Sequence, residues 1–198
     1  MEADWEVELG PESPVIDVAW TGFVDLRANP DRMDEIAETA RLPRLAAALS
    51  KLNAQTSFPN DPYAMALQTV KCDLWPTGAC DPYEMEATPA TSVYGIACYI
   101  DLVPRQEGVF PSLQAAESWA KLLSQKLRIA TSPASRVDLI VRRAVTPADS
   151  GFGITAYISA CGASVKASEQ ALGGALDVFA ENVTAPRIPS RISSTLQP

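Results

Sequence analysis

The sequence predicts an α+β fold with a ferredoxin-like β-α-β-β-α-β core, extended by an N-terminal strand and a C-terminal β-α unit. Some segments alternate apolar and polar residues, as strands do, and in others the apolar residues recur every three or four positions, as in helices. The two kinds of segment follow one another along the chain. Hydrophobic residues make up 47% and charged residues 20% of the 198 residues, as in globular domains. The order strand, helix, strand also repeats along the chain. We expect one domain over residues 1–184 and a loose tail, rich in Pro, Ser and Arg, over 185–198.

The N-terminal part of the chain contains two strand-like runs and two helical runs. Residues 5–9 alternate apolar and acidic side chains, and residues 15–26 form a longer β-rich run beyond a Gly-Pro turn signal. Asn29-Pro30 is a typical helix start, with asparagine as the cap and proline in the first turn. Pro43 is expected to end this helix and to begin the next, because proline lacks the amide hydrogen that a helix interior requires.

Strands and helices alternate through the rest of the chain, and a long irregular connection is expected at 76–91. Ser112 and Ser164 are the expected helix caps. Gly173-Gly174 is expected to let the last helix approach the sheet closely. Strands are expected at 63–75, 93–102, 136–145 and 152–161, and helices at 113–127 and 165–183.

An internal repeat supports the β-α-β-β-α-β order. Residues 14–76 and 92–147 each follow the order strand, helix, strand. At the ends of their first strands, residues 23–26 read Phe-Val-Asp-Leu and residues 99–102 read Tyr-Ile-Asp-Leu. This self-similarity favours a duplicated unit, and two such units in one sheet, with helices on one face, give the ferredoxin-like order.

Composition and charge exclude several classes of function. The net charge of −8 argues against nucleic acid and anionic membranes as partners, because both attract positive charge. The chain has no histidine, which excludes a Ser-His-Asp triad, a Cys-His pair and histidine metal ligands. It has no apolar run long enough to span a bilayer, and its N-terminus lacks the basic and apolar segments of a secretory signal. The four cysteines are therefore expected to be reduced thiols in a cytoplasmic protein.

The strand alternation predicts a sheet face that another surface can approach. One side of each strand is apolar and is expected to pack on the helices. The opposite side combines small residues with one aromatic ring per strand. Three occupants of this face are open: a segment of this chain, such as its N-terminal hairpin or acidic loop, a second copy stacked on the sheet, or a small molecule. The residues expected on this face are Thr21, Phe23, Tyr99, Thr155 and Tyr157, with Lys71 and Arg142 on neighbouring strands.

We therefore expect a non-enzymatic cytoplasmic binding module that self-associates, or binds another protein, through this face. The alternative is a small enzyme. Cys161 lies just before a helix start, where a cysteine can become a better nucleophile. Asp25 and Asp101 occupy equivalent predicted strand ends, where two carboxylates can divide acid and base roles. No motif indicates a cofactor or a metal, and the spacing of Cys72 and Cys80 leaves a disulfide open.

Overall fold

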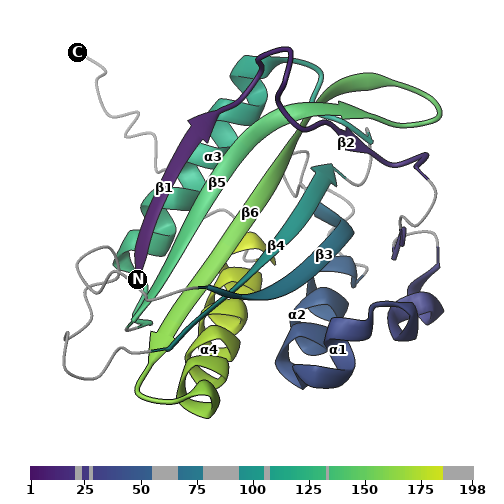
Figure 1. The fold of residues 1–198 in the computed structure, drawn as a ribbon. Coiled ribbons are helices and arrows are strands. Elements are labelled where there is room, and N and C mark those ends of the chain that lie inside the picture. The colour runs from purple at the N-terminus through teal and green to yellow at the C-terminus, as the bar shows by residue number, and fades with distance from the viewer. Residues whose placement is uncertain are drawn as a thin grey trace, which may run out of the picture.

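The computed structural model describes residues 1–20, 24–26, 29–54, 67–77, 94–104, 108–132 and 134–184, with residues 67–77 described by their backbone. Figure 1 shows the fold coloured along the chain. Its elements are β1 (Glu2–Val7), β2 (Ile16–Asp17), the 3-10 helix η1 (Pro30–Glu35), α1 (Ala37–Arg41), α2 (Pro43–Asn53), β3 (Leu67–Thr77), β4 (Tyr94–Pro104), α3 (Leu113–Ile129), β5 (Ser135–Val145), β6 (Ser150–Gly162) and α4 (Val165–Thr184).

Within the described residues, six strands form one sheet. Its order is β1-β5-β6-β4-β3, and β2 pairs with the end of β5. β1 and β2 run parallel to β5, whereas the pairs β5-β6, β6-β4 and β4-β3 are antiparallel. β4 and β5 therefore run in the same direction with β6 between them, and α3 connects them (Figure 1).

The structure confirms a mixed α+β architecture, but its strand order differs from the predicted one. A ferredoxin-like unit places the strand before its first helix between the two strands that flank its second helix. Here the position between β4 and β5 is held by β6, which follows both of them in the chain. The internal repeat stays a prediction, because much of its first copy lies outside the described residues.

The long strand predicted at residues 15–26 is a second difference. Among the described residues of this run, only Ile16–Asp17 pairs as a strand, opposite the last two residues of β5. The preceding part of that β5 edge already pairs with β1, and the N–H of Glu8 extends this pairing by donating to the carbonyl of Val141 at 3.0 Å. Because β1 occupies most of the edge, backbone groups for a second parallel strand remain only at its end.

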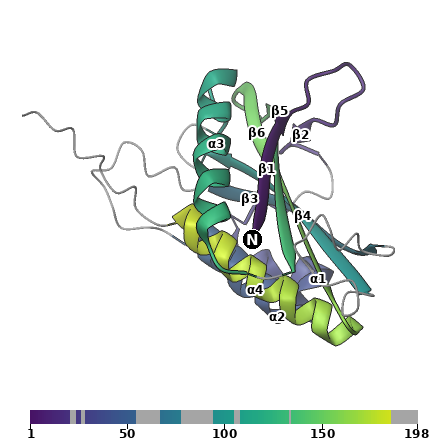
Figure 2. The ribbon, with the colours of Figure 1, turned by 90° about the vertical axis from the view of Figure 1, so that its left-hand side faces the viewer.

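Helices α3 and α4 cover one face of the sheet, and α2 packs beside α4 (Figure 2). Pro43 begins α2 as predicted. The hydroxyls of Ser112 and Ser164 accept hydrogen bonds from the N–H groups of Ala115 and Ala167 at 3.2 Å each, which confirms both predicted caps. None of the described helices is long and apolar enough to cross a membrane. The core between sheet and helices includes Ile96, Cys98, Ile100, Leu123, Leu127, Leu139, Val141, Ile154, Ile158, Leu172 and Phe179.

Gly173 marks a close approach to another helix, whereas the sequence predicted an approach to the sheet. A Cβ atom on Gly173 would collide with the side chain of Arg44, which belongs to α2. The glycine therefore lets α2 and α4 pack together. Ion pairs join the exposed sides of the same two helices and of α1: Arg41–Glu169, Arg44–Asp177 and Lys51–Glu181.

Candidate binding site on the open sheet face

The face of the sheet opposite the helices, called here the open face, carries the rings of Tyr99 and Tyr157. Tyr99 of β4 and Tyr157 of β6 are paired in the register, and their ring centroids lie 5.9 Å apart. Neither ring belongs to the helical core, which takes the alternate residues of both strands. Thr155 lies beside them, and its hydroxyl donates to the carboxylate of Asp101 at 2.6 Å. Phe23 and Thr21 lie outside the described residues, as does the side chain of Lys71.

The chain's own N-terminal segment covers one end of the open face. Ile16 is buried and packs with Val103, Val109 and Ala144 in a small cluster that is separate from the main core. Gly153 of β6 permits this packing, because a Cβ atom there would lie 2.9 Å from Cδ1 of Ile16. At this end of the open face, a segment of this chain therefore fills the space above Gly153. This segment is the first of the three predicted occupants.

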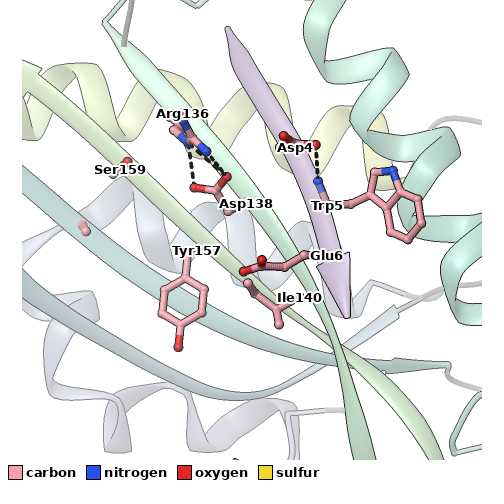
Figure 3. A pocket seen from close by; sticks show the side chains of 9 residues that line it. Asp4, Trp5, Glu6, Arg136, Asp138, Ile140, Tyr157 and Ser159 are labelled. Carbon is pink, nitrogen blue, oxygen red and sulfur yellow. Dashed lines mark hydrogen bonds and ion pairs between the residues drawn. The ribbon is translucent and has the colours of Figure 1, made fainter. Parts of the chain in front are cut away.

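The open face also contains a cavity of about 430 Å³, called here the sheet groove. Side chains of β1, β4, β5 and β6 surround it, whereas the indole of Trp5 points the other way, towards α3 (Figure 3). Its volume falls within the range of about 300–1,000 Å³ that is typical of small-molecule sites. The sheet groove is lined by Asp4, Trp5, Glu6, Ala97, Arg136, Asp138, Ile140, Tyr157 and Ser159.

Carboxylates outnumber cations in the sheet groove. Nε and Nη2 of Arg136 donate to Asp138 at 2.8 Å each, and Nη2 of Arg128 donates to Asp4 at 3.2 Å. Glu6 is exposed and has no cationic partner within the described part of the chain. The groove therefore has an excess of negative charge, which favours an organic cation as its ligand.

A second cavity of about 260 Å³, called here the arginine pocket, lies between the sheet and the N-terminal segment. Tyr157 lines both cavities, so the arginine pocket adjoins the sheet groove. Trp20 is 63% exposed, whereas Asp101 and Arg142 are buried. The pocket is lined by Pro14, Val15, Ile16, Asp17, Trp20, Tyr99, Asp101, Arg142 and Tyr157.

Arg142 is a buried cation with a donor that is not used. Its side chain is 9% exposed, and its Nη2 donates to Oε2 of Glu8 at 2.6 Å. Its guanidinium carbon lies 5.6 Å from the centre of the Tyr157 ring, and both contacts stabilise the buried charge. The Nε–H group is also buried and has no acceptor among the residues that the structure describes. Leaving a buried donor without an acceptor costs about 1–3 kcal/mol.

The structure places Cys161 at the end of β6, 2% exposed, with its Sγ 3.8 Å from the carbonyl oxygen of Ala134. Helix α4 begins later, at Val165, and Ser164 caps its first turn. Cys98 lies in the core, and burial raises the pKa of its thiol to about 12. Both thiols are buried, whereas a nucleophilic thiol must be accessible to its substrate.

Asp25 and Asp101, the two carboxylates of the alternative hypothesis, differ in their described surroundings. Asp25 lies in irregular backbone before η1 and belongs to none of the described strands. Asp101 belongs to β4 and lines the arginine pocket, which does not include Asp25. Among the described residues, no group of three side chains could hold a metal ion. Cys80 and the side chain of Cys72 lie outside these residues, so their disulfide stays untested.

The charged lining of the sheet groove was not identified from the sequence, although its signal was present. Residues 2–8 carry an acidic side chain at every second position, and the run 136–142 carries charges at Arg136, Asp138 and Arg142. This periodicity placed charges on one side of each strand. It did not show that β1 pairs in parallel with β5, far along the chain, with Glu6 opposite Ile140.

No known protein family matches this chain, and no curated protein or solved structure matches it either. The function is therefore inferred from the two cavities and their charges.

Proposed function

We propose that this protein is a non-enzymatic binding module that takes up a small organic cation in the sheet groove. The observation that carries the proposal is the exposed Glu6 carboxylate, without a cationic partner in the described chain, beside a cavity of about 430 Å³. The carboxylates of Asp4 and Asp138 are each paired with a guanidinium group, of Arg128 and Arg136, so the third lining carboxylate, that of Glu6, gives the excess negative charge. Such a cavity attracts ammonium groups and repels anions, and aromatic rings such as that of Tyr157 also favour cations.

A binding role is supported by the position of the nucleophilic candidate Cys161. Its side chain is buried, and it lines neither the sheet groove nor the arginine pocket.

Self-association through the open face stays a prediction that the charges disfavour. In a symmetric dimer the same surface of both copies meets. Stacking two sheet grooves would bring Asp4 and Glu6 of one copy near acidic residues of the other, and like charges at an interface are costly. A small cation, in contrast, is stabilised by these carboxylates.

A matched pair of small molecules tests the proposal. Titration calorimetry compares 1,5-diaminopentane with glutarate, which has the same chain length and the opposite charge. We expect the diamine to bind with a dissociation constant on the order of 1 mM or tighter, and glutarate not to bind. Glu6→Gln should weaken diamine binding about three- to fivefold, because an exposed ion pair contributes up to about 1 kcal/mol. Asp34→Asn removes an exposed acid from η1 and should leave the affinity unchanged.

Binding of glutarate in preference to the diamine would contradict the proposal, and so would an equal loss of affinity in the two variants. Sedimentation under the same conditions tests the alternative occupant. A dimer that Glu6→Gln strengthens, with no diamine binding, would assign the open face to a second copy instead.

A further inference from the structure

Strand β1 ends the order of the described strands, and of these it pairs with β5 alone (Figure 2). We propose that its other edge binds an extended peptide with basic side chains at alternate positions, which pairs with β1 as an additional strand. The inference rests on the proposed function of the sheet groove, because a basic side chain of the peptide supplies the cation that the groove takes up.

The hydrogen bonds of β1 show which of its backbone groups point away from β5. The N–H of Glu8 donates to the carbonyl of Val141 in β5 at 3.0 Å. Successive residues of a strand direct their backbone groups to opposite sides, so those of Trp5 and Val7 point to the other edge of β1. The N–H of Trp5 agrees with this direction, since it donates to Oδ1 of Asp4 at 2.8 Å.

Side chains close the first half of this edge and leave the second half open. Nε of Arg128 donates to the carbonyl of Ala3 at 2.7 Å, and Asp4 occupies the N–H of Trp5. The carbonyl of Trp5 and both backbone groups of Val7 have no partner within the described part of the chain. Extended peptides bind to sheet edges through such free main-chain groups.

The charges beside this edge decide which peptide fits. Residues that lie opposite each other in adjacent strands point to the same face of a sheet. The peptide residue facing Val7 would therefore point to the helical side, and its two neighbours would lie beside Glu6 and Glu8 on the open face. Glu6 has no cationic partner within the described chain, whereas Glu8 is paired with Arg142. A lysine or arginine beside Glu6 is attracted to its carboxylate.

The same geometry favours apolar residues between the basic ones. Val7 and Trp5 are half-buried and pack against the main core, so an apolar side chain fits beside them. A second copy of β1 is a poorer occupant of this edge, because it would bring further acidic side chains beside Glu6, and like charges on adjacent strands are destabilising.

Two capped pentapeptides of the same composition and charge test the proposal by titration calorimetry: Lys-Val-Lys-Val-Lys and Lys-Lys-Lys-Val-Val. We expect the alternating peptide to bind about tenfold more tightly than 1,5-diaminopentane, because backbone hydrogen bonds add to the attraction between charges. The second peptide, which lacks the alternation, should bind more weakly. Glu6→Gln should weaken binding of the alternating peptide about three- to fivefold, and Asp34→Asn should leave it unchanged.

Amide hydrogen exchange in the wild-type chain measures the strand pairing itself. In the free chain the N–H of Val7 should exchange rapidly, whereas that of Glu8 should be protected by its bond to Val141. When the alternating peptide occupies about nine tenths of the chain, exchange at Val7 should slow about tenfold. Saturation with 1,5-diaminopentane should leave exchange at Val7 unchanged.

If the diamine binds, but the alternating peptide binds no more tightly and exchange at Val7 is unchanged, the strand pairing is overturned and the proposed function stands. Equal affinities of the two peptides would show that charge alone is recognised, which also overturns the pairing. If neither the diamine nor the peptides bind, the proposed function itself is contradicted.

Discussion

The two faces of the sheet are built by the same strands and differ in what covers them. On the helical face, Ile154 and Ile158 of β6 are fully buried beneath the helices. On the open face, their neighbours Tyr157 and Ser159 line the sheet groove. Because side chains alternate along a strand, a core position and a cavity position are adjacent in the sequence. The comparison shows that one strand can supply stability through one set of residues and binding through the other.

The open face itself contains two kinds of small residue. Gly153 lies beneath Ile16, so its missing side chain is required by the chain's own packing. Ala97 and Ser159 line the sheet groove, where a larger side chain would fill the cavity. Small residues on a strand therefore predict a close approach without identifying what approaches.

The largest difference in stability is expected between substitutions at two adjacent residues of β6. Ile158→Ala should destabilise the protein by about 2–5 kcal/mol, because it removes apolar contacts and leaves a cavity in the core. Ser159 follows Ile158 in the chain but points to the open face, so Ser159→Ala should change stability by less than about 0.5 kcal/mol. Urea denaturation followed by tryptophan fluorescence measures both. Similar losses in the two variants would mean that the faces are not distinguished as described.

The contact beneath Ile16 should produce an intermediate effect. Gly153→Ala places a Cβ atom 2.9 Å from Ile16 Cδ1 and 3.0 Å from the carbonyl oxygen of Leu102, so we expect a loss of about 1–3 kcal/mol in stability. Gly174→Ala in α4 is the matched control, since its nearest neighbour is Arg44 Nη1 at 3.9 Å. Alanine favours a helix over glycine by about 0.5–1 kcal/mol, so this control should be stabilised. A neutral or stabilising Gly153→Ala would argue against the packing of Ile16 on the sheet.

The thiol of Cys98 should give a smaller, pH-dependent effect. Burial on the helical face raises its pKa from 9.0 to about 12, so the folded state binds the proton more tightly than the unfolded state. The resulting contribution to stability is present in full below about pH 9 and is lost as the pH rises towards 12. Between about pH 9 and pH 10 the loss should be about 1 kcal/mol.

Denaturation curves of the wild type and of Cys98→Ala at a series of pH values isolate this contribution, because the other titrating groups are common to both proteins. The variant should lose stability less steeply with pH. Parallel curves for the two proteins would show that Cys98 is not buried in the folded state.

Much of the helical side of the fold could be predicted from the sequence, because its signals are local. The alternation in β4 and β6 correctly separated Ile100 and Ile158 from Tyr99 and Tyr157. Pro43 correctly marked the start of α2. Such signals depend on backbone geometry and burial within a few residues, so a single segment contains them.

The sheet edge and the binding site could not be predicted to the same extent, because they depend on pairing between distant segments. The alternating acids near Glu6 were visible, but their position beside Ile140 follows from the parallel pairing of β1 with β5. The same pairing explains why only Ile16–Asp17 pairs as a strand among the described residues of the run at 15–26, since β1 takes most of that edge of β5.

Isoleucine methyl resonances test the central claim most directly, because isoleucines lie on both faces. Ile140 lines the sheet groove, whereas Ile154 and Ile158 are buried beneath the helices. On titration with 1,5-diaminopentane, the Ile140 methyl resonance should shift along a saturable curve while those of Ile154 and Ile158 stay in place. An unchanged Ile140 resonance at high diamine concentration, or shifts confined to Ile154 and Ile158, would contradict binding in the sheet groove.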